Sequence, residues 1–159
     1  MNLHQTAVER EFGTQVTVKI NGGDFTVDEG DTILTACTQA GIDTPTICYA
    51  ENLTPVNACR VCVVEVEGNR TLVPSCSRPV EEAMVISTDS DRVKHSRKMV
   101  LEFLGTANDL SEAPQINEWS TEYGVDITRY AEGAERFDQP VKIQDNLYIR
   151  DYDKCVLCY

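Results

Sequence analysis

Four cysteines lie within 29 residues of this chain, with ten, two and thirteen residues between successive ones: Cys48, Cys59, Cys62 and Cys76. The stretch between the first two contains Asn52, Pro55 and Asn57 and shows no hydrophobic periodicity, so we expect a loop there. Cysteines gathered in an irregular loop are typical of a disulfide framework, a zinc site or an iron–sulfur site, and are unusual for ordinary core residues. The fold must therefore bring a loop and a more distant segment together.

Composition and charge narrow the setting of these thiols. The 159 residues include seven cysteines, an odd number that cannot pair completely within one chain, and residues 1–12 lack the basic and apolar regions of a secretory signal. We therefore predict a cytoplasmic protein, in which clustered cysteines bind metal more often than they form disulfides. No apolar run approaches the roughly 20 residues of a transmembrane segment. The net charge of −12 disfavours nucleic acid as a partner and suits a basic docking partner.

The strand pattern before residue 90 predicts a small mixed β-sheet. Alternating apolar residues over 15–28 flank Asn21-Gly22-Gly23, a hairpin signal in which both glycines accept positive φ. Residues 61–74 predict a second hairpin that turns at Gly68-Asn69, and residues 83–88 predict one further strand.

A short helix is predicted between the two hairpins. Asp31 or Thr32 can cap its start, and Gly41 can end it in the left-handed conformation. Ile33, Leu34 and Cys37 fall on one face of this helix, so we expect Cys37 to be a small buried hydrophobe and not a metal ligand. A helix laid across a mixed sheet gives an α+β fold.

After residue 90 the pattern becomes helical and then irregular. An amphipathic helix is predicted from Asp91 to a stop at Gly105, and a shorter one from Pro114 to about Tyr123, ended by Gly124. We therefore divide the chain into an arm, a sheet domain, a helical or irregular extension and a C-terminal segment: 1–13, 14–90, 91–150 and 151–159.

Zinc is the first alternative for the four thiols. Structural zinc sites present two close pairs of ligands, either C-x2–4-C twice or one such pair with two histidines. Among these four thiols only Cys59 and Cys62 form such a pair, and His4 and His95 lack the spacing of a histidine pair. Because His95 lies in a run of Arg and Lys, we expect it on the solvated surface.

A 2Fe–2S cluster suits the spacing better. Such a cluster needs four thiolates, which proteins draw from a loop and from a segment beyond a strand. Cys48, Cys59 and Cys62 would lie on the loop and its exit, and the second hairpin would return Cys76 to the same end of the sheet. Since the bound cluster carries net negative charge, backbone N–H groups must face its sulfurs. Apolar neighbours would keep water away: Val61, Val63 and Val73.

The segments "GIDTPTICY…ACRVCVVEVEG…LVPSCSRPV" resemble the N-terminal 2Fe–2S module of the large iron–sulfur subunit of respiratory NADH:quinone oxidoreductase. Similar modules occur in NAD-dependent formate dehydrogenase alpha chains and in iron-only and NAD-reducing hydrogenases. The resemblance continues through "RVKHSRKMVLEFL" and, more weakly, to the end of the chain. It implies a β-grasp ferredoxin domain whose 2Fe–2S ligands are the four cysteines of the motif: Cys48, Cys59, Cys62 and Cys76.

Two features depart from this family. Members often carry, after the long helix, a second cluster bound by one histidine and three cysteines, but no cysteine occurs here between Cys76 and Cys155. We predict that this cluster is absent. The ending "DKCVLC" resembles the start of a bacterial-type 4Fe–4S run, of which Cys155 and Cys158 would be the first two ligands. This resemblance implies that the sequence is an N-terminal piece of a longer parent chain. A free C-x2-C pair with a redox role is the alternative.

These patterns predict one-electron transfer through a 2Fe–2S cluster, in a module or subunit of a larger NADH-, formate- or hydrogen-linked oxidoreductase. No nucleophile, general acid or nucleotide-binding loop stands out, so any catalytic site is expected elsewhere in the parent chain or complex. The expected partners are other redox subunits or domains of that complex. Two alternatives stay open, a zinc-stapled scaffold or interaction module and a cluster-dependent sensor.

Overall fold

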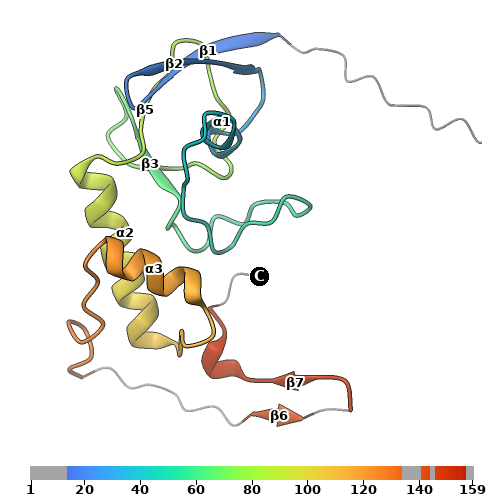
Figure 1. Cartoon of the computed structure of the whole chain (residues 1–159), viewed down its shortest axis with the longest axis vertical. Coiled ribbons are helices and arrows are strands. Elements are labelled where there is room, and N and C mark those ends of the chain that lie inside the picture. The colour runs from blue at the N-terminus through green and yellow to red at the C-terminus, as the bar shows by residue number, and fades with distance from the viewer. Residues whose placement is uncertain (1–13, 134–140, 144–145, 157–159) are drawn as a thin grey trace, which may run out of the picture.

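The computed structural model describes residues 14–133, 141–143 and 146–156. Its first part is a five-stranded mixed sheet of order β2-β1-β5-β3-β4, with helix α1 (Ile33–Gln39) packed across it (Figure 1). The strands are short: β1 (Gln15–Ile20), β2 (Gly23–Asp28), β3 (Val63–Val66), β4 (Val73–Pro74) and β5 (Val85–Ser87). β1 and β5 run parallel in the sheet, whereas the other neighbouring strands are antiparallel. The predicted α+β class is confirmed.

The first hairpin forms where the sequence predicts it, but with a different role for one glycine. Asn21 (φ 50°) and Gly22 (φ 88°) make the two-residue turn, and both have the positive φ that a tight hairpin of this length requires. Gly23 already belongs to β2 and is not among the residues with positive φ, so that detail of the prediction was wrong. A Cβ atom at Gly23 would lie 2.9 Å from Cε2 of Phe25, and the missing side chain makes room for that ring.

Helix α1 begins and ends at the predicted residues. The Thr32 side chain accepts a hydrogen bond from the Thr35 backbone N–H at 3.1 Å, and Gly41 has a φ of 71°. Ile33 and Cys37 are fully buried in the core between this helix and the sheet, as expected for Cys37.

The extension leads away from the sheet along α2 (Asp91–Ala107), and α3 (Pro114–Glu122) packs on α2 (Figure 1). The short hairpin of β6 (Lys142–Ile143) and β7 (Ile149–Arg150) and the 3-10 turn η1 (Tyr152–Lys154) follow. Within the described residues, no helix combines the length and the apolar composition that crossing a membrane requires.

Gly105 does not end α2, contrary to the prediction, because the helix continues to Ala107. Its missing side chain serves a tertiary contact instead. A Cβ atom at Gly105 would lie 2.5 Å from Cγ2 of Ile127, so the glycine lets the segment after α3 approach the helix closely.

Gly105→Ala is therefore expected to lower the free energy of unfolding by about 1 kcal/mol. Alanine is the better helix former by about 1 kcal/mol, but overpacking at a tight contact costs about 1–3 kcal/mol. Thermal unfolding of the single variant, of Ile127→Ala and of the double variant checks this result. The double variant should be at least as stable as Ile127→Ala alone, and a Gly105→Ala protein more stable than wild type would contradict the close contact.

Helix α2 buries two charged side chains that the apolar pattern did not identify. Arg97 is 3% exposed and donates to the Val63 carbonyl oxygen at 3.1 Å and to the Tyr123 hydroxyl at 3.0 Å. Glu102 is fully buried and pairs with Arg129 at 3.3 Å. Since Val63 begins β3 and Tyr123 is the C-cap of α3, Arg97 joins the sheet, α2 and α3 at one point.

Candidate iron–sulfur site

The second hairpin brings Cys62 and Cys76 together. Val63 of β3 pairs with Pro74 of β4, so the residues just outside this pair are neighbours. The Ser75 backbone N–H donates to the Cys62 carbonyl oxygen at 3.3 Å, and the two thiol sulfurs lie 3.5 Å apart. That separation far exceeds the roughly 2.05 Å of a disulfide and is close to the roughly 3.8 Å between two thiolates on one tetrahedral metal ion with bonds of about 2.3 Å.

The loop between α1 and β3 brings Cys48 and Cys59 together in the same way. The Cys59 backbone N–H donates to the Cys48 sulfur at 3.4 Å. Asn57 (φ 57°) and Arg60 (φ 60°) both adopt the left-handed conformation, which bends the loop on either side of Cys59. Burial raises the pKa of the Cys59 thiol, while backbone N–H groups beside it, among them that of Val61, act in the opposite direction. Backbone donors therefore face sulfur in this loop, as the sequence predicted.

The two pairs are close enough to affect each other's ionisation. Contact with Cys76 lowers the pKa of the Cys62 thiol to about 6. The pKa of Cys76 is raised by the same contact, by burial and by the charges of Cys62, Cys48 and Cys59. Four thiolates at such distances repel one another, so full ionisation requires a cationic centre among them, and metal binding to thiols is coupled to loss of their protons in this way.

The donor set fits a centre with two metal ions. None of the described cysteines forms a disulfide. The thiols approach instead as two pairs, Cys48 with Cys59 and Cys62 with Cys76, and a 2Fe–2S cluster takes four thiolates, two on each iron. Ser75 supports the fit, because its hydroxyl is fully buried without a hydrogen-bond partner among the described residues and is available to donate to sulfur.

Apolar side chains separate the thiols from water. Val61 is fully buried, and Leu34 and Tyr49 pack on Cys62 and Cys76. Leu34 thus faces the thiols and not the sheet core that Ile33 and Cys37 fill.

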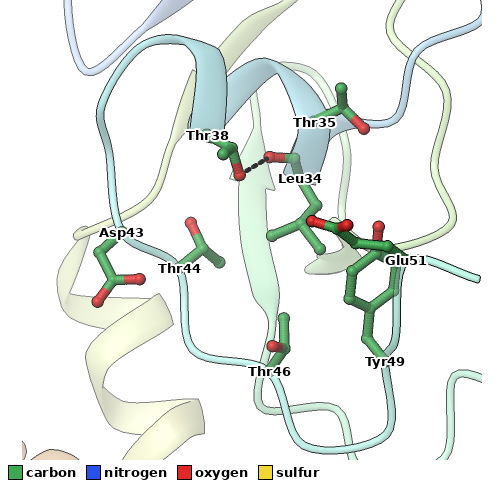
Figure 2. Close-up of a pocket in the computed structure, with 8 residues that line it drawn as sticks. All are labelled: Leu34, Thr35, Thr38, Asp43, Thr44, Thr46, Tyr49 and Glu51. Carbon is green, nitrogen blue, oxygen red and sulfur yellow. Dashed lines mark hydrogen bonds between the residues drawn. The ribbon is translucent and has the colours of Figure 1, made fainter.

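Leu34 and Tyr49 also line one side of a neighbouring pocket of about 380 Å³ (Figure 2). Four threonines and two exposed carboxylates, those of Asp43 and Glu51, complete its lining. An acidic, hydroxyl-rich hollow therefore lies next to the thiols.

The remaining candidate residues lie apart from the four thiols. Cys37 is in the sheet core, and His95 is exposed on α2, both as predicted. Cys155 is exposed and follows η1. His4 and Cys158 lie outside the described residues, so only Cys155 of the C-terminal C-x2-C pair is described.

The start of the Cys155 segment is attached to the loop before α3. Lys154 forms ion pairs with Asp109 at 3.2 Å and with Glu112 at 3.3 Å, and the Asp109 backbone N–H donates to the Asp153 carbonyl oxygen at 2.8 Å. The loop between α2 and α3 therefore contacts the η1 turn.

Sequence reasoning missed two residues that contact the site or its supporting strand. The Asn57 side-chain oxygen accepts from the Ser77 hydroxyl at 2.7 Å and from the Cys76 thiol at 3.3 Å. The available signal was an asparagine two residues before Cys59, since asparagine favours the left-handed conformation and carries two kinds of hydrogen-bonding atom. Arg97 could have been found because it lies four residues from both Val93 and Leu101, on the buried face of α2.

Comparison with known proteins identifies the sheet domain. Residues 13–91 match the family described as the 2Fe–2S iron–sulfur cluster binding domain. Three relatives illustrate the similarity. The NADP-reducing hydrogenase subunit HndD of Solidesulfovibrio fructosivorans is 38% identical over 91% of this chain and 26% of its own length. An NADH-quinone oxidoreductase subunit of Rickettsia felis is 37% identical over 78% and 18%, and the mitochondrial NADH-ubiquinone oxidoreductase 78 kDa subunit of Candida albicans is 31% identical over 91% and 21%.

A solved structure shares the fold. The match is to an NAD⁺-reducing [NiFe]-hydrogenase in its H₂-reduced state, with a TM-score of 0.74 over 90% of this chain and 62% of the hydrogenase chain, at 21% identity. The chain spans about a quarter or less of the length of the three relatives above. Through residues 13–91, this chain belongs to the family of 2Fe–2S iron–sulfur cluster binding domains.

Proposed function

We propose that this chain transfers single electrons through a 2Fe–2S cluster, as a module or subunit of a larger NADH-, formate- or hydrogen-linked oxidoreductase. The observation that carries the proposal is the arrangement of four thiols in two pairs within a domain of the 2Fe–2S family. Cys48 and Cys59 would hold one iron and Cys62 and Cys76 the other. When bound, such a cluster accepts and releases one electron at a time.

The chain's own residues would set the environment of this centre. The Cys59 backbone N–H, which donates to the Cys48 sulfur, stabilises negative charge there. The buried side chains of Val61 and Leu34 exclude water, and Tyr49 packs beside them. Hydrogen bonds to sulfur and solvent exclusion are two of the means by which proteins adjust the potential of a cluster.

Other redox subunits or domains of a larger complex are the proposed partners. The relatives named above are described as oxidoreductase and hydrogenase subunits, and this chain corresponds to a small part of each. The net charge of −12 and the carboxylates of Asp43 and Glu51, which line the same pocket as Leu34 and Tyr49, favour a basic docking partner. We further propose that Cys155 and Cys158 contribute to a 4Fe–4S cluster in a longer parent chain. The cytoplasmic location and the absence of a His/Cys cluster stay predictions.

The test is metal and sulfide analysis of the anaerobically purified protein, followed by electron paramagnetic resonance before and after dithionite. We expect about two irons and two acid-labile sulfides per chain, with no signal when oxidised and a signal of one unpaired electron when reduced. Tightly bound zinc without sulfide would overturn the proposal in favour of a structural module. A cluster that is lost within minutes of exposure to air would favour a sensor.

A further inference from the structure

Asn57 is the polar side chain of the ligand loop that reaches across to the second thiol pair. It is half-buried, and its oxygen Oδ1 accepts hydrogen bonds from the Ser77 hydroxyl at 2.7 Å and from the Cys76 thiol at 3.3 Å. Ser77 directly follows Cys76, so one amide joins the loop before β3 to the segment after β4. This contact lies at a sulfur that the proposed function assigns to iron.

The hydrogen bond between Asn57 and Cys76 requires that the thiol carry its proton. As a ligand to iron, Cys76 is a thiolate and has no proton to donate. An amide oxygen would then face a negatively charged sulfur, and two acceptors would be in contact. Rotation of the side-chain amide by 180° removes this conflict, because it exchanges the acceptor oxygen for the donor NH₂ group, which has a similar shape. With the NH₂ group in that place, its two hydrogens can reach the Ser77 oxygen and the Cys76 sulfur.

We infer that Asn57 donates an N–H···S hydrogen bond to the Cys76 thiolate and thereby raises the reduction potential of the cluster. The inference rests on the proposed function, since it needs a cluster at these thiols. The reduced cluster carries one more negative charge than the oxidised one, so a donor at the sulfur stabilises the reduced form more. Asn57 is thus a positioning and tuning residue that acts through Cys76, and Ser77 fixes the orientation of its amide.

A purely conformational role for Asn57 makes a different prediction. Its φ of 57° lies in the left-handed region, where glycine is the most easily accommodated residue and asparagine the next. If backbone conformation were the whole role, glycine would replace Asn57 without effect on the potential. Asn57→Gly therefore removes the amide while it leaves the loop backbone unstrained, and it is the decisive variant.

The experiment is a redox titration of the holoprotein monitored by electron paramagnetic resonance, for wild type and three variants. For Asn57→Gly we expect the equilibrium constant for reduction to fall about tenfold, which for a one-electron couple moves the midpoint about 59 mV to more negative values. For Asn57→Asp, whose side chain has the same shape but no donor, this equilibrium constant should fall further. For Ser77→Ala the equilibrium constant should fall less, because the Asn57 amide keeps its donor and loses only the partner that orients it. An equilibrium constant for reduction of Asn57→Gly within about twofold of the wild-type value, with full iron and sulfide, overturns the inference.

A spectroscopic measurement decides the matter without relying on a variant. In protein labelled with asparagine that carries ¹⁵N only in its side-chain amide, pulsed electron paramagnetic resonance of the reduced cluster should show a ¹⁵N coupling, and Asn57→Gly should lack it. Wild-type protein without this coupling overturns the inference even if Asn57→Gly fails to retain its cluster. Failure of the proposed function looks different, because a preparation without iron and sulfide has no cluster signal to titrate.

Discussion

Cys76→Ala is expected to reduce the iron and acid-labile sulfide of the purified protein from about two of each per chain to almost none. Cys76 is 1% exposed and its sulfur lies 3.5 Å from that of Cys62, so no water-exposed group can replace it as a ligand without rearrangement of the hairpin. Three thiolates leave one iron incompletely ligated, and the free energy of metal binding that supports the fold is lost with it. Metal and sulfide analysis after anaerobic purification, with the visible absorption spectrum, measures the effect.

Cys37→Ala is the matched control for that experiment. Cys37 is also fully buried and lies only a few residues before the ligand loop, but it packs in the sheet core. Its loss should leave both irons in place and cost about 1 kcal/mol of stability through the removed atom. Full iron in Cys76→Ala would remove Cys76 from the ligand set, and loss of iron in Cys37→Ala would assign Cys37 a role that its location does not suggest.

Arg97→Met should lower the midpoint of thermal unfolding by about 6–12 °C. The guanidinium makes two buried or half-buried hydrogen bonds, to the Val63 carbonyl oxygen and to the Tyr123 hydroxyl. A hydrogen bond from a charged group contributes about 1.5–3 kcal/mol, and methionine would leave the carbonyl oxygen of Val63 without this donor. A loss of about 3 kcal/mol corresponds to about 2–4 °C per kcal/mol in a chain of this size. Circular dichroism of the anaerobic holoprotein follows the transition.

Two variants separate the buried hydrogen bonds from the change of charge. Lys94→Met removes one positive charge from an exposed position of α2 and should change stability by less than about 0.5 kcal/mol. Tyr123→Phe removes only one of the two hydrogen bonds and should cost about 1 kcal/mol. If Arg97→Met lowered the midpoint of thermal unfolding no more than Lys94→Met, the junction of the sheet, α2 and α3 would not depend on the guanidinium.

Much of the fold was predictable because its signals are local. The first hairpin turn and the α1 cap depend on the φ preference or the side-chain oxygen of one or two residues. The turn forms within the predicted Asn21-Gly22-Gly23 segment, and Thr32 is the cap among the two candidates Asp31 and Thr32. Gly105 shows where local reasoning fails. A glycine late in a helical pattern suggests a stop, but here the missing Cβ atom accommodates Ile127, a residue distant in sequence. Only the packed structure determines which of these two roles applies.

The candidate site likewise has features that local sequence signals predict and features that depend on tertiary packing. The spacing of the four cysteines was sufficient to predict that they would meet, because a loop and a hairpin return were both readable from the sequence. The contact between Asn57 and Cys76 was not predictable, since it depends on how the loop bends at residues with positive φ. The burial of Arg97 likewise depends on the packing of α2 against β3 and α3, which hydrophobic periodicity alone does not describe.

The parallel pairing of β1 with β5 has a consequence for biosynthesis. Lys19 is beside Val85 and Ile20 is beside Ile86, so the middle of the sheet joins the first strand of the domain to its last. All four thiols belong to the stretch of polypeptide that this pairing closes, and they leave the ribosome before β5 does. A nascent chain therefore exposes all four of the proposed cluster ligands while the sheet that fixes their geometry is still unfinished. A cluster inserted at that moment would cross-link the open chain and favour closure of the sheet, so maturation of the cofactor and folding of the domain become a single coupled event.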